Sequence, residues 1–308
     1  MGANVACCLA ALLSATGGAK SVELPHTIEA AFRVEPGQTA YLRHDVLVKG
    51  VLEFGAGSRL VLRGREPARI VVTGKLTASG DKDHLVWFGA GKVRRNQWKG
   101  ILADGQVELA WAVIQGAEAG ITARHGSALD LDSVVIRYCG QGINGHSNMR
   151  LKNCLVAKNF GDGVYFASDG VAMASTSILS NEGWGIRTGH YPKLTLTDCS
   201  IIGNAQGGLW LGSREGKDPS CEATRCNIHS NGQIDIRNGD RSREVILDGC
   251  YLGSVTTREI KRKGEKANLT RIIDLFDGTS APVSLRNPAS KAIAEAGCSL
   301  DCSWVRRK

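Results

Sequence analysis

The stretch KNFGDGV, residues 158–164, decides the fold of this 308-residue chain because its pattern returns at nearly constant spacing. An Asn is followed four residues later by a Gly and then by an aliphatic residue. The pattern recurs as SNEGWGI (180–186), as GNAQGGL (203–209) and, in a looser form, as SNGQI (230–234). An earlier copy, RYCGQGI (137–143), has Tyr138 at the position of the Asn. A repeated sequence of this kind predicts a repeated backbone unit.

The length of the repeat indicates which unit it is. The Gly of the Gly-aliphatic pair recurs at spacings of 20, 22, 21, 22 and 23 residues, at Gly100, Gly120, Gly142, Gly163, Gly185 and Gly208. A helical repeat needs about 33 residues for its two helices. The segments between the turns, such as LTLTDCSII (194–202), are short, β-branched and alternating, which is typical of strands. Leucine-rich repeats have a similar length, but their fixed Leu ladder is absent. The repeat therefore predicts one coil of an all-β parallel solenoid.

The Asn residues form a column of their own at the corner between two strands. Asn tolerates the left-handed backbone region and bonds nearby backbone groups. Amides stacked on successive coils can also bond each other along the solenoid axis. We therefore predict a structural ladder, not catalytic residues, at Asn159, Asn181, Asn204 and Asn231.

A second column lies five residues before the ladder and contains Ser133, Cys154, Thr176, Cys199 and Cys226, with Cys250 aligned to it. Branched residues two positions further on alternate with it, which predicts that both columns face the interior. An exported protein with ten cysteines usually forms disulfides. Stacked coils lie about 4.8 Å apart, but their Cβ vectors run parallel, which is poor disulfide geometry. We predict buried, structural, free thiols at Cys199, Cys226 and Cys250. The pairing of Cys221 is left open, and Cys298 and Cys302 allow a local disulfide, free thiols or a metal.

The first residues predict export. VACCLAALLSATGGA (5–19) fits the apolar core and small-residue cleavage site of a signal peptide at 1–19, although no basic residue precedes it. The Cys7-Cys8 pair allows a lipoprotein anchor as the alternative. No other segment is apolar and long enough to cross a bilayer. We expect a secreted, periplasmic or cell-surface protein.

The remaining chain divides by pattern. We expect N-terminal coils and a cap over 20–97, regular repeats over 98–254, a closing coil over 255–288 and a C-terminal tail over 289–308. The tail contains KAIAEA (291–296), a helix-like stretch that would cap one end, as every solenoid requires.

Several of these motifs resemble a known family. The Asn ladder, GKLTASGD (74–81) followed by HLVWF (84–88), QWKGI (97–101) and the closing segment 249–288 resemble the secreted right-handed parallel β-helix repeat proteins of the pectate-lyase-like fold. The resemblance covers residues 34–288. It implies a single-stranded right-handed β-helix of about nine or ten coils with a short helical or irregular C-terminal cap. In the closing segment, Cys250-Tyr251-Leu252-Gly253 stands where the family has Asn-Tyr-Trp-Gly. A shared fold implies no particular activity.

Candidate site residues follow from the strand alternation. With Ile121, Ile143, Val164, Ile186, Leu209 and Ile234 pointing inward, the next residue in each copy points outward. Coils repeat about every 4.8 Å, close to the length of one sugar ring. Aromatic faces stack on sugars, and Arg pairs with carboxylate or sulfate. The net charge of +8 favours an acidic glycan, although an ordinary basic surface with no ligand is the alternative. The predicted ligand-binding residues are Arg124, Asn144, Tyr165, Arg187, Trp210 and Asp235.

An enzyme is the alternative reading of the same face. In a polysaccharide lyase, epimerase or glycoside hydrolase, Arg187 would neutralise a carboxylate, and Tyr165 or His146 would act as base or acid. The paired Asp and Gly-His-Gly motifs of polygalacturonases are missing. Asp130 and Asp132 are interpreted as solvent-facing strand residues and not as a Ca²⁺ site.

We expect no metal, no cofactor and no specific nucleic-acid binding, and the oligomeric state is left open. The sequence therefore favours a non-catalytic glycan-binding or envelope scaffold protein, with a purely structural surface protein as a third class.

Overall fold

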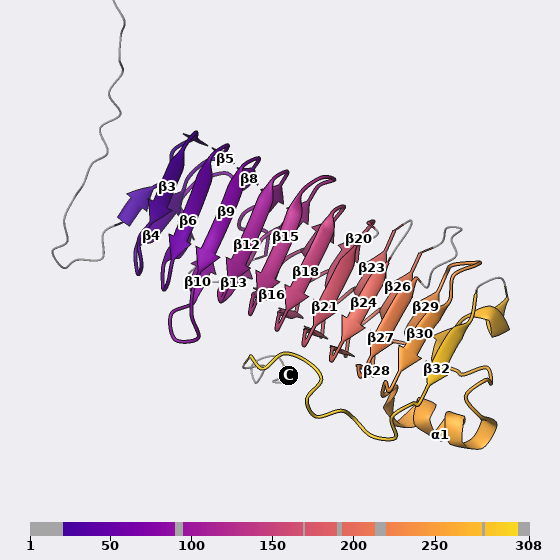
Figure 1. The fold of residues 1–308 in the computed structure, drawn as a ribbon. Helices are drawn as coiled ribbons and strands as arrows, with labels where there is room; N and C mark the ends of the chain where they lie inside the picture. Colours follow the sequence, from indigo (N-terminus) through magenta and orange to yellow (C-terminus); the bar gives the residue numbers. More distant parts are fainter. Residues whose placement is uncertain are drawn as a thin grey trace, which may run out of the picture.

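The computed structural model describes residues 21–89, 95–168, 170–189, 193–212, 220–278 and 281–300 (Figure 1). These residues form a parallel β-solenoid in which each coil contributes one strand to each of three sheets, here called A, B and C. The described residues place 10 strands in sheet A and 11 in each of sheets B and C, which confirms the predicted all-β solenoid of about nine or ten coils. The expected signal peptide, residues 1–19, and Cys302 lie outside the described residues.

Sheet A has an outward face that the C-terminal segment later covers. Its strands are β1 (Ser21–Glu23), β4 (Thr39–Leu42), β7 (Arg59–Leu62), β10 (Val86–Phe88), β13 (Ala112–Gln115), β16 (Val135–Arg137), β19 (Leu155–Ala157), β22 (Ser177–Leu179), β25 (Ser200–Ile202) and β28 (Asn227–His229).

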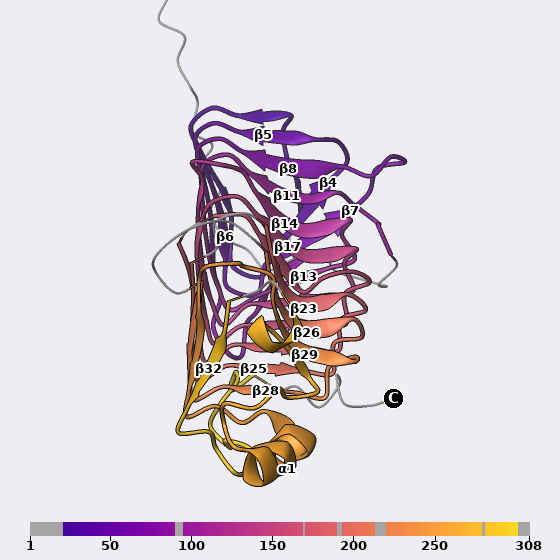
Figure 2. The same cartoon turned by 90° about the vertical axis from the view of Figure 1, so that its right-hand side faces the viewer.

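Sheet B follows the Asn corner and carries most of the predicted site residues (Figure 2). Its strands are β2 (Thr27–Ile28), β5 (Val46–Val48), β8 (Arg69–Val72), β11 (Gly100–Ala103), β14 (Ala119–Ala123), β17 (Gln141–Gly145), β20 (Val164–Phe166), β23 (Trp184–Thr188), β26 (Gly207–Leu211), β29 (Ile234–Asn238) and β31 (Ile272–Ile273).

Sheet C completes each coil. Its strands are β3 (Ala31–Val34), β6 (Val51–Gly55), β9 (Lys75–Ser79), β12 (Gln106–Ala110), β15 (Ala128–Asp132), β18 (Asn148–Lys152), β21 (Val171–Ala174), β24 (Leu194–Thr197), β27 (Cys221–Thr224), β30 (Val245–Asp248) and β32 (Val283–Arg286).

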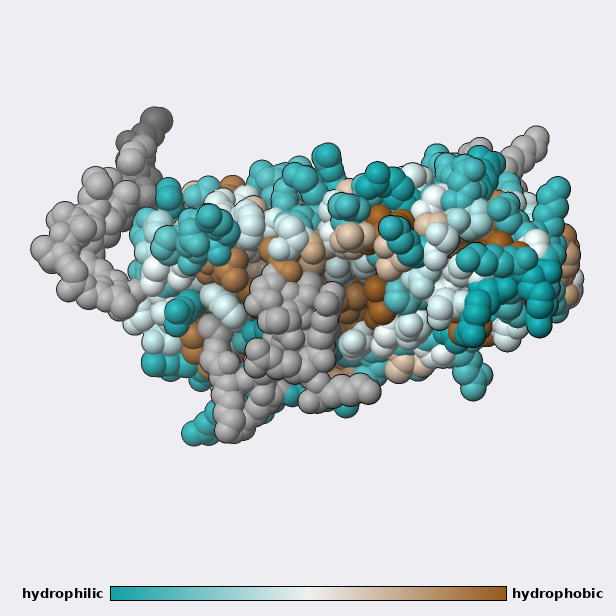
Figure 3. Space-filling view, turned by 90° about the horizontal axis from the view of Figure 1, so that it is seen from below, coloured by the Kyte–Doolittle hydropathy of each residue, from teal (hydrophilic) through white to brown (hydrophobic). Residues whose placement is uncertain are grey.

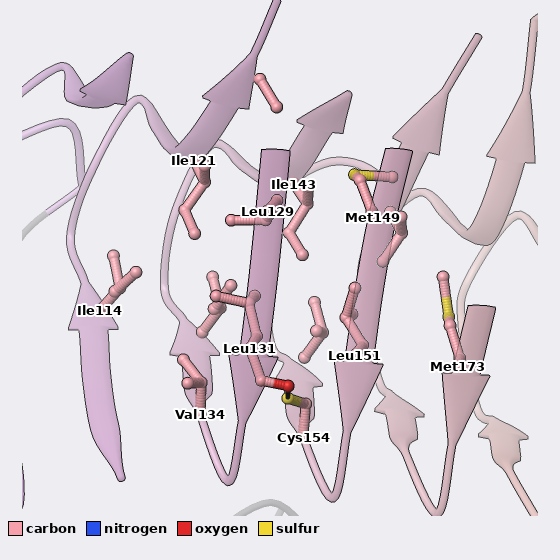
Figure 4. Close-up of a cluster of buried hydrophobic side chains, with 14 of the residues drawn as sticks. Ile114, Ile121, Leu129, Leu131, Val134, Ile143, Met149, Leu151, Cys154 and Met173 are labelled. Atoms are coloured by element: carbon pink, nitrogen blue, oxygen red, sulfur yellow. Dashed lines mark hydrogen bonds between the residues drawn. The ribbon is translucent and has the colours of Figure 1, made fainter. Parts of the chain in front are cut away.

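The interior is a continuous apolar core built from rows of identical register. Ile121, Ile143 and Val164 are paired in successive coils and are each 0% exposed. Figure 4 shows Ile121 and Ile143 of this row beside Leu129 and Leu131 from sheet C. Successive residues of a strand point to opposite faces of the sheet. Every second residue therefore points inward, and these apolar residues together exclude water from the core.

The Asn ladder is confirmed. In each step the Oδ1 of one Asn accepts two bonds from the preceding ladder Asn, from its backbone N–H at 3.1 Å and from its Nδ2 at 2.9 Å. Each Nδ2 also donates to the carbonyl of the preceding coil, for example Asn181 to Val156 at 3.2 Å. All four members are at most 1% exposed, so the ladder satisfies polar groups that water does not reach.

Two details of the predicted corner are wrong. The left-handed residue is not the Asn but the residue before it, for example Lys158 (φ 54°) and Ser180 (φ 53°). In the earliest copy Tyr138 takes this left-handed position (φ 54°), so Cys139, not Tyr138, occupies the ladder position and donates its N–H to Asn159 Oδ1 at 3.0 Å. The Asn is thus selected for its amide and not for its backbone freedom.

The Cys column is buried, and Cys199, Cys226 and Cys250 are free thiols. They are stacked, because the N–H groups of Cys199 and Cys226 each donate to the sulfur of the next coil at 3.4 Å. The first member of this column is Val134 rather than Ser133, since the register pairs Ile136 with Val156. Cys221 is also a buried free thiol.

The C-terminal end is closed by helix α1 (Gly253–Lys263), a short 3-10 helix (Leu275–Asp277) and the last strands of sheets B and C. The stretch KAIAEA (291–296) is not helical, contrary to its composition. Its backbone groups bond side chains of sheet A instead: Asn227 Nδ2 donates to the carbonyl of Ile293 at 2.9 Å. We call residues 289–300 the C-terminal strap (yellow in Figure 1). Within the described ranges, no helix has the length and apolar character needed to span a bilayer.

Candidate ligand-binding face

One row of side chains runs along the outward face of sheet B, one residue from each coil. The strand register aligns its members, which are Thr122, Asn144, Tyr165, Arg187, Trp210 and Arg237. The structure therefore brings four of the six predicted ligand-binding residues into one line along the solenoid axis.

Rings and guanidinium groups alternate in this row. The Cζ of Arg187 lies 5.3 Å from the ring centroid of Tyr165 and 5.7 Å from that of Trp210. The Cζ of Arg237 lies 5.3 Å from the Trp210 ring on the other side. Each distance is within the range of a cation–π contact. We call the four residues Tyr165, Arg187, Trp210 and Arg237 the ridge.

The charge of Arg187 is balanced within the protein. Its Nε lies 2.7 Å from Oδ2 of Asp162, whose side chain is only 8% exposed. The other oxygen of Asp162 accepts the backbone N–H of Trp184 at 2.8 Å. Arg187 is thus held in place between two rings. Its pairing with a carboxylate on the protein reduces its ability to neutralise one on a ligand.

Arg237 is different. It is exposed, and among the described residues no carboxylate oxygen lies within ion-pair distance of it. Among the described residues, the ridge cation without a carboxylate partner is therefore at the C-terminal end of the ridge, and it is not one of the predicted ligand-binding residues.

Glycine in the next coil makes room for the rings. A Cβ on Gly207 would lie 2.2 Å from Cζ3 of Trp184, so the indole covers the backbone of the following strand. A Cβ on Gly189 would lie 2.8 Å from the hydroxyl of Tyr165. Trp184 is buried and its ring centroid is 5.4 Å from that of Trp210, so it supports Trp210 from below.

The other predicted residues lie at the margin of the ridge. The His146 ring, which is exposed, meets Tyr165 edge-on with centroids 6.0 Å apart. Asn144 is half-buried beside Tyr165 in the row. Arg124 is exposed two coils before Tyr165, with Nη1 3.4 Å from Asp104. The three candidate catalytic residues, His146, Tyr165 and Arg187, are therefore neighbours.

Asp235 is not on this face, and its predicted outward position is wrong. The last copy is shifted by two residues, so that Ile236, not Ile234, pairs with Leu209 and points inward. Asp235 is 1% exposed, and its carboxylate accepts the N–H and Nδ2 of Asn231, each at 3.0 Å. It also pairs with Arg271. Asp235 thus ends the ladder by replacing the next Asn, because a carboxylate accepts the same two bonds.

Three hollows lie on other faces of the described residues. Two of them, of about 400 and 590 Å³, adjoin over sheet C and share Asp130 and Arg150. A third, of about 670 Å³, lies near the N-terminal coils around Trp87. Asp130 is exposed, and Asp132 pairs with Lys152 at 3.0 Å, as expected for solvent-facing strand residues.

Two residues that support the ridge, Asp162 and Trp184, and one of its members, Arg237, are missing from the predicted site residues. The first two stand three residues after the ladder Asn in their copies, at the corner that precedes or begins the sheet B strand. Aligning this column across the repeats identifies it as a second outward row. Arg237 is not among the predicted ligand-binding residues because the shifted last copy assigns its place in the row to Asp235.

Comparison with known proteins supports the fold. Residues 92–217 match the family model of the right-handed β-helix region. The comparisons with curated proteins and with solved structures each gave no match. The family match over these residues and the three parallel sheets together show the right-handed parallel β-helix fold.

Proposed function

We propose that this right-handed β-helix is an exported protein that binds glycans, including acidic ones, along the ridge of sheet B. The observation that carries the proposal is the alternation of Tyr165, Arg187, Trp210 and Arg237 over four successive coils. Export is part of the proposal and rests on the apolar segment 5–19.

The geometry suits a polymer that lies along the solenoid axis. Tyr165 and Trp210 are two coils apart, which corresponds to about 10 Å at the usual strand spacing. Two rings at this spacing can stack on two sugar units of one chain. Arg187 and its partner Asp162 hold the rings apart without adding net charge.

Arg237 supplies the preference for acidic chains. Its guanidinium is held against Trp210 and carries a charge that no described carboxylate balances. A carboxylate or sulfate on the ligand would accept two parallel bonds from it. We therefore transfer the anion-binding role from Arg187 to Arg237.

A catalytic role at the same face is the second candidate, and one observation favours it. His146, Tyr165 and Arg187 come from three successive coils, and the Tyr165 ring is in contact with both of the other side chains. A lyase or epimerase needs a group that neutralises the carboxylate of the sugar. Because Arg187 already pairs with Asp162, binding is better supported than catalysis.

Glycan-array binding of the mature chain tests the proposal. We expect Trp210→Ala to weaken binding at least about tenfold, because it removes one stacking platform. Trp87→Ala is the matched control, since Trp87 is also a half-buried outward Trp, but on sheet A. Equal binding by the Trp210 variant and the unaltered protein would refute the site.

The acidic preference has its own test. Arg237→Gln should remove the preference for acidic over neutral glycans and reduce the salt dependence of binding, while neutral glycans still bind. Glycans bound by the unaltered protein should then be incubated with it and examined for cleavage or epimerisation. Turnover by the unaltered protein that is lost in Tyr165→Phe would show that this face is catalytic.

A further inference from the structure

The outward face of sheet A is occupied by the chain's own C-terminal strap. Figure 1 shows the strap running back beneath the sheets, from the end near α1 toward the middle of the solenoid. In sheet A, the outward row that it follows changes from apolar to polar along the chain. Its later members are Leu155, Ser177, Ser200 and Asn227, one in each coil.

The polar members of this row bond the backbone of the strap. Asn227 makes two bonds to Ile293: Oδ1 accepts its N–H at 2.9 Å, and Nδ2 donates to its carbonyl at 2.9 Å. Ser200 Oγ donates to the carbonyl of Ala296 at 2.8 Å, and Ser177 Oγ accepts the N–H of Cys298 at 2.9 Å. The row therefore binds main-chain groups of the strap in three successive coils, on both sides of the turn at residues 293–296 that the Ala296 N–H closes on the Ile293 carbonyl at 3.3 Å.

Two further hydrogen bonds hold the strap on sheet A. Asn153 Oδ1 accepts the N–H of Ser299 at 2.7 Å, and the carbonyl of Asp198 accepts the N–H of Gly297 at 2.7 Å. Cys298 and Leu300 pack on a small apolar cluster around Leu155, which is 0% exposed although it points out of the coil. The polar bonds set the position of the strap, and the apolar contacts add affinity.

The link between the strap and the solenoid is short, and its Asn287 Nδ2 donates to Asp248 Oδ1 at 3.1 Å. Only Asn287 and Pro288 lie between the end of β32 at Arg286 and the first strap residue, and Asn287 has a positive φ of 48°. An element that is joined by such a link and held by contacts that any identical copy can reproduce is exchangeable between molecules.

We propose that the outward face of sheet A from β19 to β28 is a peptide-docking surface, and that the C-terminal strap of a second copy of this chain binds it in trans. The structure already contains the complementary pair in one molecule. This inference is independent of glycan binding.

A peptide tests the surface directly. The probe is a fluorescent peptide of residues 288–300, PASKAIAEAGCSL, with its Cys replaced by Ser. The strap variant is the full chain with Ile293→Pro and Ser299→Pro, which removes two of the N–H donors. We expect the peptide to bind the strap variant and to bind the unaltered chain at least about tenfold more weakly, because the tethered strap competes at high effective concentration.

Adding Asn227→Ala to the strap variant should weaken peptide binding about tenfold or more, because two hydrogen bonds are lost. Glu222→Gln, an exposed change on sheet C, is the control and should have no effect. A strap variant that melts like the unaltered chain but does not bind the peptide overturns the proposal.

Hydrogen exchange on the unaltered chain covers the case in which the strap variant does not fold. Excess peptide should speed the exchange of the Ile293, Cys298 and Ser299 amides, because it holds the row whenever the strap is released. Unchanged exchange of these amides would overturn the docking surface.

Mixing tests the second copy. The row variant carries Ser200→Ala and Asn227→Ala, so its strap is intact but its outward row binds a strap weakly. The strap variant has an intact outward row but a strap that binds weakly. Light scattering after size exclusion should find a 1:1 complex of the two in the mixture and monomers of each alone. Peptide binding without this complex would reject the partner.

Discussion

The outward faces of sheets A and B are built on the same coils, yet one is covered by the chain and the other carries exposed rings and charges. On sheet A, Leu155 points out of the coil and is still 0% exposed, because the strap lies over it. On sheet B, Tyr165 and Arg187 occupy the equivalent outward positions and stay partly exposed. Seen from below, brown apolar patches interrupt the hydrophilic surface of the molecule (Figure 3). The repeat therefore specifies the interior residues, whereas the outward residues of sheets A and B differ in type and can have separate roles.

The largest effect should come from the core that both faces share. Ile201→Asp places an unpaired charge at a 0% exposed position, and we expect it to abolish folding of a domain with a typical stability of about 5–15 kcal/mol. Ile202→Asp, the next residue, points outward and is only half-buried, so it should fold. Circular dichroism and thermal melting distinguish the two. Native-like melting of the Ile201 variant would contradict the assigned register.

The next effect separates the two outward faces. Leu155→Asp should cost at least about 3 kcal/mol, because the strap keeps water away from this position. Tyr165→Asp should change the free energy of unfolding by no more than about 1 kcal/mol. Urea unfolding measures both. If the two changes have equal cost, the strap does not cover sheet A in solution.

The pH dependence of stability distinguishes the interior from both faces. Burial raises the pKa of the Cys139 and Cys154 thiols from 9.0 to about 12. Unfolding exposes them, so between pH 9 and 12 the unfolded chain releases protons that the folded chain retains. Stability is therefore fully present below pH 9 and falls as the pH rises, by about 1.4 kcal/mol per pH unit for each thiol. Melting curves from pH 8 to 11 measure this.

Cys154→Ala provides the control for this pH effect. It should reduce the slope of stability against pH above pH 9, whatever it does to stability at neutral pH. A slope equal to that of the unaltered chain would show that folding does not raise the pKa of the Cys154 thiol.

The smallest effect concerns the support of the ridge. Gly207→Ala adds a Cβ that would lie 2.2 Å from the Trp184 ring, so that ring and its neighbour Trp210 must move. We expect glycan affinity to fall several-fold and Trp fluorescence to shift, with little change in melting temperature. Ala205→Ser, an exposed change in the same coil, is the control. Unchanged affinity with a shifted fluorescence spectrum would show that Trp210 does not bind the ligand.

Much of this molecule was predictable from its sequence because a solenoid depends on local repetition. The spacing of the Gly-aliphatic pairs predicted the coil, and the Asn column predicted the ladder, since each bond joins equivalent residues of adjacent coils. Tyr165, Arg187 and Trp210 were placed in one row for the same reason. Where the repeat drifts, prediction failed: Cys139 and Asp235 replace Asn at the two ends of the ladder, and each was misplaced by one or two residues.

Other features depended on contacts between residues that are distant in sequence. The helix-like KAIAEA became a strap because Asn227, 66 residues away, satisfies the backbone of Ile293 better than a short isolated helix would. The ion pair of Asp162 with Arg187, and the support of Trp210 by Trp184, depend on which residues of neighbouring coils meet. By itself, the sequence determined the coil, the ladder and the inward rows, because these follow from strand alternation and a constant period. Only the tertiary structure decided which outward face is covered and which guanidinium group of the ridge pairs with a described carboxylate, because both depend on side chains from different coils.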